Sequence, residues 1–95
     1  MHLSDVILRK SEILALAEKH GARDVRVFGS VARGTATDDS DLDLLVALAP
    51  VRTPFFPGGL KADLEDLLGC SIDIVTEQSL HRLMRAQILA ECRSI

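Results

Sequence analysis

This 95-residue sequence has few aromatic residues, few cysteines and only a small net charge. It has no Trp or Tyr and only three Phe, so stacking of single-stranded bases on aromatic rings is not expected. The net charge of −3 argues against a general nucleic-acid-binding protein, which is usually basic. Two cysteines, Cys70 and Cys92, lack the CxxC spacing and are too few for a disulfide framework. We expect both to be reduced thiols that serve as small apolar packing residues.

Long apolar runs and a secretion signal are also missing. No segment is long enough and free enough of charge to span a bilayer. The N-terminal sequence MHLSD lacks the basic region and apolar run of a signal peptide. The sequence therefore predicts a cytoplasmic protein without membrane contact. Its length predicts one domain over residues 1–95, with enough apolar residues (47%) for a packed core.

Apolar spacing and turn residues predict a small α/β fold. Helical spacing covers residues 4–20, a short turn capped by Ser30 covers residues 31–33, and Leu60 to Leu68 form an amphipathic helix. A last helix is expected after Ser79, which would cap it. Strands are expected over residues 25–28, 41–47 and 72–75. The predicted order is α-β-α-β-α-β-α, a three-stranded sheet covered by helices.

Two carboxylates stand at alternate positions of the second predicted strand. Asp41 and Asp43 point to the same side of that strand, roughly 6.6 Å apart at ~3.3 Å rise per residue. At an effective dielectric of about 20, two charges at this distance repel by roughly 2.5 kcal/mol. The pair has no structural benefit for a strand, whereas a divalent cation between the two groups removes the repulsion.

A third carboxylate extends this pattern. Asp73 lies in the strand sequence SIDIV, where its apolar neighbours Ile72 and Ile74 point the opposite way. If the third strand lies beside the second, Asp73 stands next to Asp41 and Asp43. Three carboxylates form an oxygen-only site, which suits Mg²⁺ or Mn²⁺.

A Gly-Ser pair upstream predicts phosphate binding near this site. Gly29 allows the backbone to approach a ligand closely, and Ser30 opens a short helix whose free N–H groups attract phosphate oxygens. Together with the carboxylates, the pair would hold a nucleoside triphosphate and its magnesium. Arg33, one turn later, either neutralises phosphate or is a solvated charge.

The combined motif, GS followed by ten residues and DLD, resembles the signature of the DNA polymerase β-like nucleotidyltransferase superfamily. More closely, the chain resembles minimal nucleotidyltransferases, which pair with HEPN toxins in prokaryotic toxin–antitoxin systems. The resemblance covers VRVFGSVARGTATDDSDLDLLV, SIDIVTE and RAQILAECRSI, the last being similar to the family's terminal helix. It implies the nucleotidyltransferase fold with a three-stranded mixed sheet.

The resemblance also implies roles for individual residues. Gly29 and Ser30 would hold the triphosphate of ATP, and Asp41 and Asp43 would ligate two Mg²⁺ ions. Asp73 would ligate one of the metals and help to deprotonate the acceptor hydroxyl. The expected reaction moves AMP from ATP to a tyrosine of the partner HEPN ribonuclease, within a hetero-oligomer of the two proteins. Larger superfamily members add a substrate domain, so we expect the partner protein to shape the acceptor site here.

Several alternatives stay open at this stage. The protein could neutralise the toxin by covering it without catalysis, or it could transfer a nucleotide to a small molecule such as an aminoglycoside. Phe55 and Phe56, in a Pro-bounded loop, either anchor that loop or meet a partner, and the partner is slightly favoured. Three arginines form a solvated face or contact an acidic partner: Arg82, Arg85 and Arg93. Three scattered histidines are expected at the surface or at helix ends: His2, His20 and His81.

Overall fold

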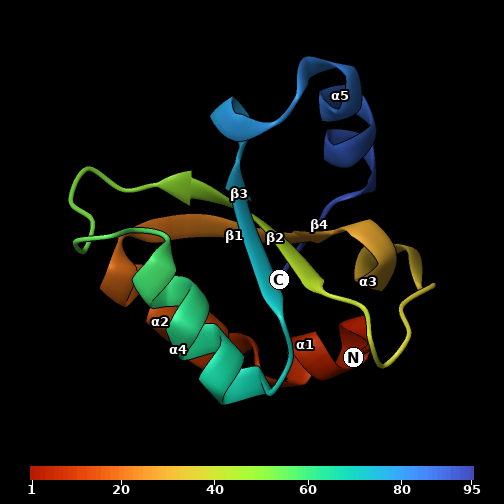
Figure 1. Ribbon diagram of the computed structural model, residues 1–95, viewed down its shortest axis with the longest axis horizontal. Coiled ribbons are helices and arrows are strands. Elements are labelled where there is room, and N and C mark those ends of the chain that lie inside the picture. Colours follow the sequence, from red (N-terminus) through yellow and green to blue (C-terminus); the bar gives the residue numbers. More distant parts are fainter.

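A computed structural model describes the chain over residues 1–95 as a four-stranded sheet with helices on both sides (Figure 1). No helix is both long and apolar enough to cross a bilayer. The elements follow in the order α1 (Leu3–Leu8), α2 (Lys10–His20), β1 (Ala22–Phe28), α3 (Gly29–Arg33), β2 (Leu42–Leu48), α4 (Gly58–Leu68), β3 (Ile72–Thr76), the 3₁₀ helix η1 (Glu77–Ser79), α5 (Arg82–Glu91) and β4 (Arg93–Ser94).

The sheet is mixed, as the resemblance implied, and its strands lie in the order β3-β2-β1-β4. Strands β2 and β3 are parallel, whereas β1 is antiparallel to both β2 and β4. The predicted count of three strands is wrong by one. After α5 ends at Glu91, Arg93 and Ser94 pair with Val27 and Arg26 of β1 as a short edge strand. Two residues are too few to produce the alternation by which a strand is recognised in a sequence.

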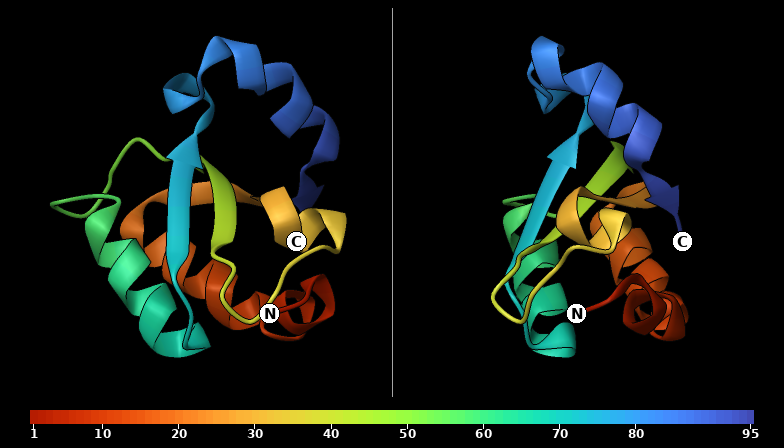
Figure 2. Two further views of the ribbon diagram at one scale, coloured as in Figure 1. Left: turned by 45° about the vertical axis from the view of Figure 1, so that its right-hand side comes forward. Right: turned by 90° about the vertical axis from the view of Figure 1, so that its right-hand side faces the viewer.

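The two faces of the sheet have different cores. Helices α1, α2 and α4 cover one face, while α5 stands on the other (Figure 2). As predicted, Leu42, Leu44 and Val46 of β2 face the first side, where they are buried with apolar residues of the three helices. On the second side a smaller cluster joins Phe28, Leu45 and Ile88. The side of β2 that carries Asp43 is therefore covered only in part.

Several helix boundaries differ from the sequence prediction. The helix expected over residues 4–20 is divided at Arg9, whose φ of −102° and ψ of 14° depart from helical values. The apolar periodicity continues through this break, and neither proline nor glycine marks it, so the sequence did not reveal it. Helix α3 begins at Gly29 with Phe28 as its cap, which places Ser30 inside the helix. Ser79 belongs to η1, and the ring of His81 caps α5 instead.

The sequence left two roles open for the loop phenylalanines and for three arginines, and the structure shows that some of these side chains are held within the fold while others are exposed. Phe56 packs against the main core and anchors its loop, whereas Phe55 is 93% exposed. Arg82 and Arg93 are exposed, and Arg85 donates to the carboxylate and carbonyl oxygens of Glu77. Cys70 and Cys92 are free thiols, each half-buried and packed against one of the two cores.

One histidine is more than a helix-end residue. His20 is the last residue of α2, and only 7% of it is exposed. Its Nδ1 lies 2.7 Å from Oγ1 of Thr53, and its Nε2 lies 2.7 Å from Oδ2 of Asp63. The backbone N–H of Thr53 also donates to the carbonyl oxygen of His20. These contacts fasten the loop between β2 and α4 to both helices, and the hydrogen bond with His20 holds the pKa of Asp63 below its usual value.

Removing this imidazole is expected to destabilise the protein. His20→Ala leaves Thr53 and Asp63 without their partner and should lower the free energy of unfolding by about 2 kcal/mol in urea titrations at pH 7. Lys19→Ala, which removes an exposed cation 3.7 Å from the same carboxylate, should cost under about 0.5 kcal/mol. The fold lowers the pKa of Asp63, so the stabilisation that ionised Asp63 gains from His20 is lost as pH falls. The difference in unfolding free energy between wild type and His20→Ala should therefore narrow below about pH 4. Equal losses in the two variants would contradict this role.

Candidate functional site

The residues singled out in the sequence lie at one end of the sheet, where β1 ends and where β2 and β3 begin. Because β1 and β2 are antiparallel, Phe28 pairs with Asp43. Because β2 and β3 are parallel, Asp43 pairs in turn with Asp73. Gly29 follows Phe28 directly and starts α3. The topology therefore brings the Gly-Ser pair and two carboxylates together from three separate strands.

Asp43 and Asp73 lie on the same face of the sheet, since residues paired across neighbouring strands point to the same side. Asp41 is exposed and lies just before β2, which begins one residue later than predicted, at Leu42. Asp43 itself is half-buried. Burial raises the pKa of its carboxyl group, and the charges of Asp73 and Asp41 raise it further, while the Arg33 guanidinium acts in the opposite direction.

The carboxylates form an open site. No three His, Cys, Asp or Glu side chains stand close enough together to enclose a metal ion, and none of the four surface hollows is lined by Asp41, Asp43 or Asp73. Mg²⁺ typically binds through one or two carboxylates and takes its remaining ligands from substrate phosphates and water. A paired Asp43 and Asp73, with repulsion that a cation relieves, has the donor chemistry of such a site.

Gly29 lies directly against Asp43. Its φ of +71° lies in the left-handed region, which side chains rarely adopt. A Cβ atom added at this position would also collide with the carboxylate of Asp43. The absence of a side chain thus lets the backbone approach Asp43, while the predicted approach to a ligand stays a prediction.

Arg33 and the backbone of Gly29 share a partner that the sequence did not reveal. The N–H of Gly29 donates to Oε1 of Glu91 over 3.1 Å. Nη1 of Arg33 lies 3.1 Å and 3.2 Å from the two oxygens of the same carboxylate. Arg33 is therefore paired and not simply solvated. Glu91 lies 62 positions from Gly29, and the sequence assigned no role to it within the segment RAQILAECRSI, so only the folded chain identifies this contact.

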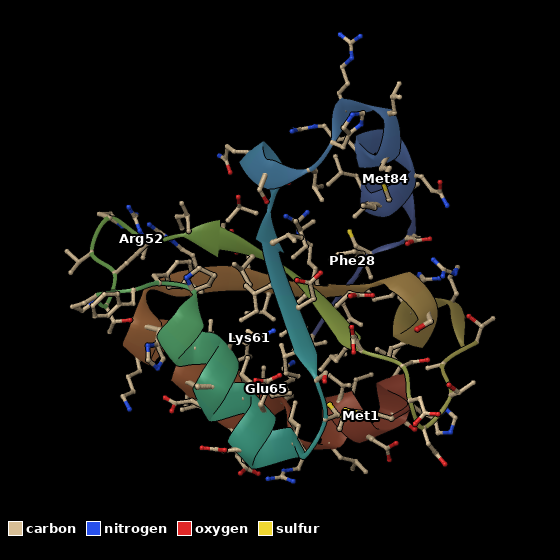
Figure 3. All side chains as sticks on the ribbon, in the orientation of Figure 1. Met1, Phe28, Arg52, Lys61, Glu65 and Met84 are labelled. Atoms are coloured by element: carbon tan, nitrogen blue, oxygen red, sulfur yellow. The ribbon has the colours of Figure 1, made fainter.

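The start of β3 is held by two side chains of α4. Lys61 and Glu65 lie on α4 beside this strand (Figure 3). Nζ of Lys61 lies 2.8 Å from the carbonyl oxygen of Ile72, and the N–H of Ile72 donates to Oε2 of Glu65 over 3.2 Å. Ile72 directly precedes Asp73, so these bonds fix the position at which this carboxylate leaves the edge of the sheet.

Comparison with known proteins identifies the family. Residues 11–95 match the nucleotidyltransferase domain. The chain belongs to this family. This nucleotidyltransferase is 38% identical over 76 residues to the protein adenylyltransferase MntA of Thermococcus cleftensis, covering 80% of this chain and 77% of that protein. It is 35% identical over 82 residues to MJ0435 of Methanocaldococcus jannaschii, provisionally named a protein adenylyltransferase, covering 86% and 88% of the two chains.

Solved structures agree with this assignment. A protein provisionally named a minimal nucleotidyltransferase has 48% sequence identity and a TM-score of 0.85, covering 100% of this chain and 97% of that one. A toxin–antitoxin crystal structure with AMP-PNP has the same fold, with a TM-score of 0.74 at 22% identity, covering 90% of this chain and 70% of that one. The resemblance to minimal nucleotidyltransferases and the predicted fold class are therefore confirmed.

Proposed function

We propose that this nucleotidyltransferase is an antitoxin that moves AMP from ATP to a hydroxyl group of a toxin and thereby neutralises it. The observation that carries the proposal is the pairing of Asp43 with Asp73 beside the turn at Gly29. The name protein adenylyltransferase, borne by relatives that match most of the chain, supports ATP as the donor and a protein as the acceptor. The fold's occurrence in toxin–antitoxin complexes supports a toxin as the partner.

In this proposal the groups of the site divide between phosphate binding and metal binding, and Asp73 also takes part in proton transfer. The N–H of Gly29, the hydroxyl of Ser30 and the guanidinium of Arg33 bind phosphate oxygens of ATP. Asp41, Asp43 and Asp73 would hold two Mg²⁺ ions, with phosphate oxygens and water as the remaining ligands. When bound, Mg²⁺ neutralises charge that develops on the phosphates during transfer.

The transfer itself exchanges a phosphoanhydride bond of ATP for a phosphoester bond to the acceptor. The hydroxyl oxygen of the acceptor attacks the α-phosphorus of ATP in line with the bond to the leaving group. The bond between the α-phosphorus and the oxygen bridging to the β-phosphorus breaks, and pyrophosphate leaves. Asp73, at the exposed edge strand, accepts the hydroxyl proton. We propose a tyrosine of a HEPN-type ribonuclease as the acceptor, in line with the family resemblance of the motifs.

The test is transfer of label from ATP labelled on the α-phosphate to the purified toxin. Wild-type protein with Mg²⁺ should label the toxin, and EDTA should abolish labelling. Asp41→Ala or Asp43→Ala should reduce the rate at least about 10³-fold, because each removes a metal ligand. Asp39→Ala is the matched control, since Asp39 is an exposed carboxylate two positions before Asp41, and it should change the rate less than about twofold.

Three results would contradict the proposal. Undiminished transfer by both site variants would refute the metal-ligand assignment. Full protection of cells by the Asp41/Asp43 double variant, without label on the toxin, would favour neutralisation by masking. Labelling of a small molecule such as an aminoglycoside in the absence of the toxin would favour the third alternative.

A further inference from the structure

The carboxylate of Glu91 occupies the groups that the proposed function assigns to phosphate. One of its oxygens accepts from the N–H of Gly29, and both lie within 3.2 Å of Nη1 of Arg33. The Glu91 side chain is only 17% exposed, although α5 as a whole is an exposed helix. An anion supplied by the chain itself thus sits against the Gly-Ser turn.

We propose that Glu91 is an internal competitor of the nucleotide, which the triphosphate must displace from Gly29 and Arg33 before it can bind productively. The inference rests on the proposed function, because it assumes that these two groups bind phosphate. The backbone N–H of Gly29 has one hydrogen, so it cannot keep its short contact with Glu91 and make the same contact with a phosphate oxygen. Nη1 of Arg33 is directed at both oxygens of Glu91 and turns to a phosphate only by giving up one of these contacts. Two anions placed side by side would also repel each other. Glu91 therefore lowers the affinity for the triphosphate.

The way in which α5 is attached makes this displacement feasible. Of its ten residues only Ile88 is buried, in the small cluster with Phe28 and Leu45. Figure 3 shows Met84 on the part of α5 remote from the sheet, and Leu83 and Met84 are 80% and 56% exposed. The helix is held near the site by Ile88 with its neighbours Leu89 and Cys92, by the bonds of Arg85 with Glu77, and by the pairing of the following β4 with β1. The displacement therefore needs a movement of the Glu91 side chain and not of the whole helix. Glu91 can leave its partners without unfolding of the main core, which lies on the other face of the sheet.

The experiment compares binding of sodium tripolyphosphate, with and without Mg²⁺, by calorimetry. Tripolyphosphate carries the phosphate chain of ATP without the base or sugar. Glu91→Gln keeps the shape of the side chain and removes its charge, so the variant should bind tripolyphosphate at least tenfold more tightly than wild type. Glu77→Gln is the matched control, because Glu77 also pairs with arginines, Arg26 at 2.9 Å and Arg85 at 3.3 Å. This substitution should leave the affinity for tripolyphosphate unchanged.

A structural role for Glu91 predicts the opposite result. If the carboxylate only holds Gly29 and Arg33 in place, Glu91→Gln binds tripolyphosphate equally or more weakly, and the proposal is overturned. Failure of wild type and variant alike to bind would also overturn it. Should Glu91→Gln lose its circular dichroism signal, Glu91→Asp takes its place. Its side chain is shorter by one methylene group, which weakens the contacts with Gly29 and Arg33, so this variant should also bind tripolyphosphate more tightly than wild type.

Label transfer by the wild-type protein separates this inference from the proposed function. Transfer to the toxin by wild type, together with unchanged tripolyphosphate affinity in Glu91→Gln, refutes only the competition. Tighter binding in the variant, without transfer to the toxin by wild type, refutes only the proposed reaction.

Discussion

Replacing Asp43 with asparagine is expected to abolish nucleotidyl transfer and, at the same time, to make the metal-free protein more stable. The amide has the shape of the carboxylate but no charge, so it is a poor ligand for Mg²⁺. It also removes the repulsion from Asp73 and Asp41 that, together with burial, raises the pKa of Asp43. Function and stability should therefore change in opposite directions at this one position.

The size and pH dependence of the gain follow from the direction of the pKa shift. Ionised Asp43 destabilises the folded state, and this cost disappears as pH falls through the raised pKa of the folded protein. Asp43→Asn should thus gain about 1 kcal/mol in urea unfolding at pH 7 with EDTA, and little near pH 3. Transfer of label should fall at least about 10³-fold.

Asp39→Asn provides the control for this experiment. It removes the same charge from an exposed loop position and should alter neither stability nor transfer appreciably. Adding Mg²⁺ with ATP should stabilise the wild type more than Asp43→Asn, since only the wild type keeps the ligand. If Asp43→Asn is less stable than wild type at pH 7, the carboxylates do not strain the sheet and the argument for a cation site weakens.

The parts of this site that the sequence could predict are those governed by local periodicity. Alternation along a strand predicted that the side chain of Asp43 points to the face away from Leu42 and Leu44. The same alternation predicted that Asp73 points away from Ile72 and Ile74. The pairing of β2 with β3 was a condition of this prediction, and the structure meets it. The close approach expected of the backbone at Gly29 also rests on a local property, because glycine has no side chain, and the positive φ found there adds a second reason for glycine.

The parts that could not be predicted depend on contacts between distant segments. Glu91 meets Gly29 through the packing of Ile88, and no spacing near either residue encodes that contact. The two residues of β4 become a strand only because Arg26 and Val27 offer them a free edge. The break at Arg9 likewise has no turn residue to mark it.

Gly29 and Gly34 form a natural pair with which to test how closely the backbone approaches Asp43. Both glycines have left-handed backbone conformations, with φ of +71° and +77°. Alanine therefore pays a similar backbone penalty at either position, about 1 to 2 kcal/mol in unfolding free energy. The surroundings differ, because a Cβ at Gly34 meets nothing within 4 Å, whereas one at Gly29 would lie 3.1 Å from Cγ of Asp43 and collide with its carboxylate oxygen.

Gly29→Ala should consequently lose activity far more than stability. The short side chain of Asp43 can rotate away from the added methyl group, and that rotation withdraws a metal ligand from the site. We expect label transfer to fall at least about 10²-fold in Gly29→Ala but less than about fivefold in Gly34→Ala, with similar losses of unfolding free energy in urea. Equal losses of transfer in the two variants would mean that strain in the turn, and not contact with Asp43, explains the need for glycine at position 29.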